Sequence, residues 1–178
     1  MSMAENDELA RIISGCQNGD AKCFSELVDA YAGRCYSYFY RLTGNNELSE
    51  EMLSELFVKL VEKMGSYRGG AFESWLFKIA SNIFHDHLRS KQRRKKLLEA
   101  KRGELELRSV EPKRSESDRL DRLQVQLAKL DPNTRELILL RFYSQLSLKE
   151  IARLRSEPIG TTLSRLHRGL KRLREMME

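Results

Sequence analysis

Helical periodicity constrains the fold of this chain more than any other feature of its sequence. Apolar residues recur at steps of three and four through most of the chain, and no segment alternates apolar and polar residues as a strand does. Only three prolines and ten glycines, the residues that most often interrupt helices, occur in 178 residues. The sequence therefore predicts an all-α protein without a sheet.

Glycines, prolines and polar clusters divide this pattern into segments. We predict helices over about residues 6–17, 21–44, 47–67, 71–100 and 118–130, then a helix opened by Asp131, a short helix over 147–154 and a last helix from 159. Glycines 69 and 70 predict a tight loop. Residues 103–117 combine a proline, serines and mixed charge without an apolar stripe, which is typical of a flexible linker. We therefore expect two small helical domains, residues 1–102 and 118–178.

Composition and charge indicate what kind of partner the protein binds and in which compartment it works. The net charge of +6 and the pI near 9.3 favour an acidic partner. No apolar run is long enough for a membrane span, and the acidic N-terminus lacks the order of a signal peptide, so we expect a cytoplasmic protein without membrane insertion. Cys16, Cys23 and Cys35 occupy apolar helical positions, which predicts buried thiols rather than a disulfide or metal site.

The last predicted helix has two unlike faces. Its apolar stripe contains Leu163, Leu166, Leu170, Leu173 and Met177. Its opposite face carries Thr161, Arg165, Arg168 and Arg172. A solvated face usually mixes positive and negative charges, whereas this one is almost purely positive and suits a polyanion such as nucleic acid.

The segment before that helix completes the outline of a helix-turn-helix. A short helix with Ile151 and Ala152 leads through a turn at Pro158 into the basic helix. Ser147 and Glu150 have the spacing of a capping box. Positions 155–157 read Arg-Ser-Glu where such motifs usually have apolar residues or a turn glycine, and an interior aliphatic site holds Thr162.

Two stretches together resemble a known family. "LSLKEIARL" followed by "PIGTTLSRLHRGLKRLRE" is similar to the C-terminal promoter-reading domain of the extracytoplasmic function (ECF) class of bacterial sigma factors. "YRGGAFESWLFKIASNIFHDHLRSKQRRKK" is similar to the N-terminal promoter-melting domain of the same class. The resemblance implies a protein that binds core RNA polymerase and directs it to promoters, through the clamp coiled coil of the largest subunit and the flap of the second largest.

The resemblance also implies three groups of site residues. For minus-ten recognition and melting they are Tyr67, Arg68, Phe72, Asn82, Arg89, Lys91, Arg93 and Arg94. For the minus-thirty-five element they are Thr161, Ser164, Arg165, His167, Arg168, Lys171 and Arg172. For the polymerase clamp they are Glu50, Glu51, Leu53, Glu55 and Phe57.

Alternatives stay open at several of these positions. For Phe72 and Trp75 we favour a place in the core over contact with DNA, whereas for Tyr67 and Asn82 we expect base contacts. The glutamates of the clamp group also fit a solvated acidic face. Leu163 either contacts a thymine methyl or belongs to the apolar stripe, and we favour the stripe.

Enzyme chemistry finds little support in the sequence. His85, Asp86 and His87 are too close along a helix to converge on one metal ion, so we expect structural or solvent roles, with Asp86 and Arg89 bracing each other. No nucleophile and base pair or phosphate-binding glycine loop stands out, and we expect no cofactor and no catalysis. The alternative to a sigma factor is a helix-turn-helix repressor or activator with an N-terminal dimerisation or sensing module. Sigma factors of this class are commonly inhibited by an anti-sigma factor, but nothing in the sequence identifies one.

Overall fold

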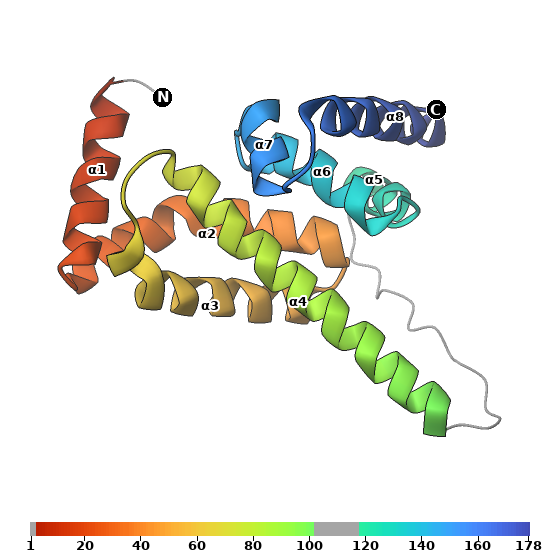
Figure 1. Cartoon of the computed structure of the whole chain (residues 1–178), viewed down its shortest axis with the longest axis horizontal. Coiled ribbons are helices and arrows are strands. Elements are labelled where there is room, and N and C mark those ends of the chain that lie inside the picture. The colour runs from red at the N-terminus through yellow and green to blue at the C-terminus, as the bar shows by residue number, and fades with distance from the viewer. Residues whose placement is uncertain (1–2, 102–117) are drawn as a thin grey trace.

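The computed structural model describes residues 3–101 and 118–178, with side chains over 7–98 and 122–178. Every regular element in those ranges is helical, which confirms the all-α prediction (Figure 1). The N-terminal part contains α1 (Met3–Gln17), α2 (Ala21–Thr43), α3 (Asn46–Lys63), the 3-10 turn η1 (Met64–Ser66) and α4 (Phe72–Lys101). The C-terminal part contains α5 (Asp118–Ala128), α6 (Pro132–Tyr143), α7 (Leu148–Leu154) and α8 (Ile159–Met177). The predicted linker at 103–117 lies outside the described residues.

Polar caps explain where several helices begin and end. The Asp20 side chain accepts hydrogen bonds from the first free backbone N–H groups of α2, and Asn45 does the same for α3. Between them Gly44, with a φ of 66°, ends α2 in the left-handed conformation that glycine tolerates. Asp131 caps α6 with Pro132 in its first turn, and Ser147 and Glu150 form the predicted capping box of α7.

The core of the N-terminal part lies between α2, α3 and α4. Its fully buried side chains include Tyr38, Phe39, Leu42, Leu56, Leu60, Leu76, Phe77 and Ile83. Cys16, Cys23 and Cys35 are buried free thiols, as predicted. Desolvation raises the pKa of Cys35 to about 12, so this thiol stays protonated and packs as an apolar side chain.

The C-terminal part is built around α6, which is buried on most of its surface from Leu137 to Leu140. Helix α8 crosses α6 closely at Gly169, where an added Cβ would lie 2.5 Å from Thr134 Cγ2. Glycine is needed there because any side chain would collide with α6. Helices α7 and α8 form the predicted helix-turn-helix, and Ser156 in their turn has a φ of 54°, the conformation usually assigned to glycine.

The two parts pack directly on each other. Helix α2 contacts α5 and α6, and α4 contacts α7. The guanidinium of Arg135 donates to the carbonyls of Leu127, Ala128 and Leu130 around the end of α5, and also to Leu42 O at 2.7 Å near the end of α2. One arginine therefore satisfies helix-end carbonyls from both parts. The C-terminal half of α4 projects away from this assembly (Figure 1).

Within the described residues, no helix is both long and apolar enough to cross a lipid bilayer.

Candidate nucleic-acid and protein interfaces

The polar face of α8 is open to solvent. The exposed members of the predicted minus-thirty-five group are Thr161, Ser164, His167, Arg168, Lys171 and Arg172. They lie opposite the buried side chains of Thr162 and Leu166, which face α6 and α7. Helix α8 is therefore held from one side and presents a basic surface on the other, the arrangement that a groove-binding helix requires.

Arg165 differs from the other arginines of α8. Its side chain is only 32% exposed, and its Nη1 donates to Glu157 Oε2 at 2.7 Å. Glu157 also accepts from Arg155 Nε at 3.2 Å and from Thr162 Oγ1 at 3.0 Å. The unusual residues in the turn of the helix-turn-helix thus form an ion-pair network that fixes the position of Arg165.

Leu163 corrects one of our interpretations. Its side chain is 53% exposed, so it does not belong to the apolar stripe that Leu166 and Leu170 form against the core. Ile159, four residues earlier, is also 53% exposed. The favoured assignment of Leu163 to the apolar stripe is wrong, and its alternative role, contact with a thymine methyl, stays a prediction.

The glycine loop between η1 and α4 borders a cavity of about 610 Å³. The walls combine loop residues Tyr67, Arg68 and Phe72 with α1 residues Ser14 and Gln17. Gln17 holds the loop, because its Nε2 donates to Tyr67 O at 2.9 Å and to Met64 O at 3.3 Å. Sequence reasoning missed this role of α1. Gly69 and Gly70, with φ values of 92° and 96°, confirm the tight loop.

The side chain of Tyr67 is buried at the glycine loop and is not exposed on its surface. It is 8% exposed, its hydroxyl donates to Gly70 O at 2.7 Å, and its ring packs against Phe72 and Trp75. In this arrangement of the loop, the Tyr67 ring is covered and is not open for stacking. Phe72 is 2% exposed, as its core interpretation predicts. Base contact by Tyr67 stays a prediction that requires the loop to move.

Helix α4 carries the remaining residues of the predicted minus-ten group on its surface. Asn82 is exposed but does not line the cavity at the glycine loop, so the structure does not join it to Tyr67 in one pocket. Arg89 lies 3.4 Å from Asp86 in the predicted brace. Further along, Lys91, Arg93 and Arg94 are exposed on the projecting part of the helix. This part is a basic surface suited to phosphates.

Helix α3 presents the predicted clamp-binding group. Glu50, Glu51 and Glu55 are exposed, while Leu53 and Phe57 are partly buried against the core. Glu51 and Glu55 also border a hollow of about 230 Å³ between α3 and α4. In Figure 1, α3 and α8 lie along opposite edges of the molecule, so the helix with the exposed glutamates and the helix with the exposed arginines are far apart.

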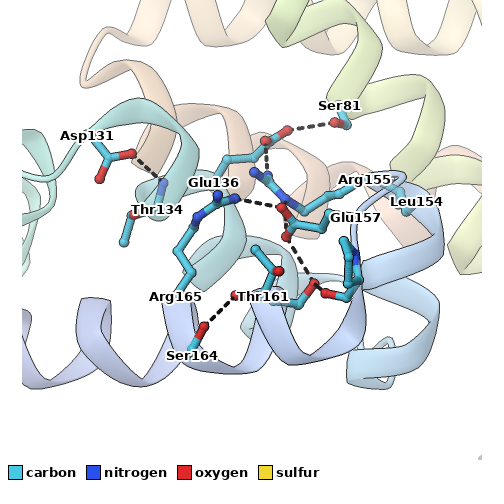
Figure 2. A network of polar contacts seen from close by, with 12 residues as sticks. Ser81, Asp131, Thr134, Glu136, Leu154, Arg155, Glu157, Thr161, Ser164 and Arg165 are labelled. Atoms are coloured by element: carbon cyan, nitrogen blue, oxygen red, sulfur yellow. Dashed lines mark hydrogen bonds and ion pairs between the residues drawn. The ribbon is translucent and has the colours of Figure 1, made fainter.

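A buried carboxylate at the contact between the two parts was not predicted. Glu136 of α6 is 0% exposed and accepts from Ser81 Oγ at 2.6 Å and from Arg155 Nη1 at 2.5 Å (Figure 2). It also accepts from the Tyr38 hydroxyl at 3.5 Å, and His85 Nε2 lies 3.1 Å from its carboxylate. Burial would raise the pKa of Glu136, but the hydrogen bonds from His85 and Ser81 and the charge of Arg155 outweigh burial and lower it.

The sequence did contain a signal for Glu136. It is the one charged residue in the run from Glu136 to Leu140, where every position is buried. A charge inside an apolar run has to find partners, and here they come from α2, α4 and the end of α7. His85 thereby has a structural role. No group of three His, Cys, Asp or Glu side chains within 7–98 and 122–178 could hold a metal ion.

Family comparisons match both parts of the chain in order. The family model for Sigma-70 region 2 matches residues 27–94, and that for Sigma-70, region 4 matches residues 120–173. The matches fall inside the two predicted domains, whose boundaries stay predictions.

Individual relatives agree with these matches. The chain is 33% identical over 157 residues to the ECF RNA polymerase sigma factor SigE of Mycolicibacterium smegmatis, covering 86% of this chain and 61% of that relative. It is 30% identical over 162 residues to the RNA polymerase sigma factor CarQ of Myxococcus xanthus, covering 90% of this chain and 92% of CarQ.

Solved structures share the fold. The sigma factor RpoE from Bartonella quintana, in complex with the anti-sigma factor NepR, has a TM-score of 0.71 at 24% identity and covers 88% of this chain and 98% of its own. CnrH, in complex with the cytosolic domain of CnrY, has a TM-score of 0.70 at 19% identity, with coverages of 93% and 94%.

Proposed function

The chain belongs to the ECF class of RNA polymerase sigma factors, and we propose that it binds core RNA polymerase, directs it to promoters and helps to open the DNA there. The observation that carries this proposal is the pair of separate surfaces in family order, a basic α4 in the first match and an open basic face of α8 in the second. The protein has no catalytic activity of its own, needs no cofactor and works in the cytoplasm.

Each surface has its own task in this proposal. The face of α8 around Ser164 and Arg168 reads the minus-thirty-five element, with Arg172 gripping phosphate. The glycine loop and the exposed side of α4 hold the opened strand of the minus-ten element. The acidic face of α3 binds the clamp coiled coil of the largest polymerase subunit, and the C-terminal part binds the flap of the second largest. An anti-sigma factor, the kind of partner present in the RpoE structure, is a further partner.

A reconstitution experiment tests the proposal. Purified protein is mixed with core polymerase and a candidate promoter, and complex formation and transcript synthesis are measured. A sigma factor forms a stable complex and supports transcripts, whereas a repressor or activator binds DNA but does neither without another sigma factor.

Charge reversal at two positions of α3 tests the clamp assignment with a matched control. Glu51→Lys should weaken polymerase binding, while Glu62→Lys, also exposed on α3 but outside the predicted clamp group, should not. Both variants should keep wild-type thermal stability because an exposed charge contributes under about 0.5 kcal/mol to folding. Equal polymerase affinity in the wild type and both variants would contradict the clamp assignment.

A further inference from the structure

Four polar side chains form a strip along α4. Lys78, Asn82, His85 and Arg89 are spaced by four, three and four residues, which places them on one face of the helix. Asn82 and Arg89 belong to the predicted minus-ten group, whereas Lys78 and His85 had no assigned contact with DNA. A strand bound along Asn82 and Arg89 must therefore run past the other two side chains.

The C-terminal part already occupies both of those side chains. The Lys78 ammonium donates to Leu154 O, the last residue of α7, at 2.6 Å. The His85 ring lies 3.1 Å from the carboxylate of Glu136 in α6. Asn82, between them on the strip, is exposed. A nucleic-acid backbone approaching Asn82 would meet the end of α7 on one side and α6 at Glu136 on the other, so the C-terminal part blocks its approach to Lys78 and His85.

We propose that the C-terminal part and single-stranded DNA compete for the Lys78–Arg89 strip of α4, and that Glu136 is the contact that keeps the strip occupied in the free protein. Opening the contact between the two parts frees Lys78 and His85 for phosphate and uncovers the strip. This inference rests on the proposed function, because that function supplies the strand.

The distance between the two promoter elements indicates that the two parts of the protein have to separate when both elements are bound. Elements named minus-ten and minus-thirty-five lie about 25 base pairs apart, or on the order of 85 Å at about 3.4 Å per base pair. A compact chain of this length has a radius of gyration of about 16 Å and is roughly 40 Å across. The packed molecule cannot span both elements, so the two parts have to separate when both elements are bound.

The chemistry of Glu136 suits a contact that opens. Arg155 belongs to the same part as Glu136, so the carboxylate keeps its strongest partner after separation (Figure 2). Ser81, His85 and Tyr38 are exchanged for water, which forms hydrogen bonds of comparable strength. Removing the charge of Glu136 weakens the closed arrangement without removing any apolar surface from it.

The test compares full-length wild type, Glu136→Gln and the control Glu175→Gln, whose side chain is 60% exposed on α8. Small-angle scattering gives the radius of gyration. Fluorescence anisotropy gives the affinity for a labelled single-stranded DNA of mixed sequence, with a duplex of the same length as comparator. Glu136→Gln should enlarge the molecule and bind the single strand about three- to tenfold more tightly, because more of the protein is open. Glu175→Gln should match the wild type.

A second variant separates opening from damage to α6. Ser81→Ala removes one hydrogen bond to Glu136 from the α4 side and should shift size and affinity in the same direction, by a smaller factor. Circular dichroism checks that each variant keeps its helices. Unchanged size and affinity in both variants would overturn the inference, as would expansion without tighter strand binding. Failure of every protein to bind the single strand contradicts the strand-holding part of the proposed function as well, whereas strand binding that is equal in all of them contradicts only the competition.

Discussion

The interior of the N-terminal part and the contact between the two parts are built from different chemistry. The interior packs apolar side chains from α2, α3 and α4 that exclude water completely, such as Leu56 and Phe77. The contact between the parts also contains apolar side chains, because the buried core runs through both parts, but it adds Glu136 and Arg135, which bind side chains and backbone carbonyls across it. Apolar surface loses its stabilisation when it meets water, whereas polar groups regain hydrogen bonds there. The polar groups of the contact can therefore exchange their partners for water if the two parts separate.

The largest effect is expected inside the N-terminal core. Leu56 is 0% exposed, so Leu56→Ala leaves a cavity and should lower the free energy of unfolding by about 2–5 kcal/mol. Leu97→Ala is the control, because Leu97 is 63% exposed on the projecting part of α4 and should change stability little. Thermal and urea unfolding measure both. If Leu56→Ala expanded the native molecule without lowering its unfolding temperature, the assignment of this residue to a permanent core would fail.

A smaller loss is expected where α8 crosses α6. Gly169→Ala brings a methyl group against Thr134 and Ile138 and should destabilise the C-terminal part by about 1–3 kcal/mol, less what alanine contributes to helix propensity. Gly160→Ala provides the comparison, since an added Cβ there meets nothing within 4 Å. Unfolding of the full chain is measured by circular dichroism. Equal stability of the two variants would contradict the close crossing.

A substitution in the turn of the helix-turn-helix should raise the stability of the protein. Ser156 is exposed and has a φ of 54°, a conformation that costs a residue with a Cβ about 1–2 kcal/mol. Ser156→Gly should remove that cost and, after the added flexibility of the unfolded chain, raise stability by under about 1 kcal/mol. Ser156→Ala keeps the Cβ and should bring no gain. The radius of gyration should stay unchanged in both, because the Ser156 side chain is exposed.

Sequence reasoning worked best where a residue acts through its neighbours in the chain. Helix periodicity, the caps at Asp131 and Ser147 and the glycine loop depend on local geometry, and the structure confirms each of them. The open basic face of α8 followed from periodicity in the same way.

Long-range contacts were the part that the sequence did not reveal. Base contact by Tyr67 was expected from the resemblance, but nothing in the sequence indicated that its ring packs against Phe72 and Trp75 or that Gln17 of α1 binds its carbonyl. Glu136 finds partners 55 residues away in Ser81 and 98 residues away in Tyr38. No spacing rule predicts which distant side chains will surround a buried charge.

Lowering the pH tests the contact between the two parts and should have the smallest effect. The pKa of Glu136 is lowered from its ordinary value of 4.5, because the hydrogen bonds from His85 and Ser81 and the charge of Arg155 outweigh the opposing effect of burial. The part of this lowering that comes from His85 and Ser81 of α4 exists only in the closed arrangement, so it stabilises that arrangement fully above the ordinary value and is lost as the pH falls through the lowered pKa. Scattering between pH 7 and pH 3.5 should therefore show expansion only in the acid part of the range. Glu136→Gln, which has no carboxylate at this position, should lack that step.

Because burial offsets much of what the partners contribute, the step should be small and should precede loss of helicity. Expansion and loss of helicity at the same pH, in the wild type and in Glu136→Gln alike, would mean that acid unfolds the core and that the contact between the parts does not open on its own.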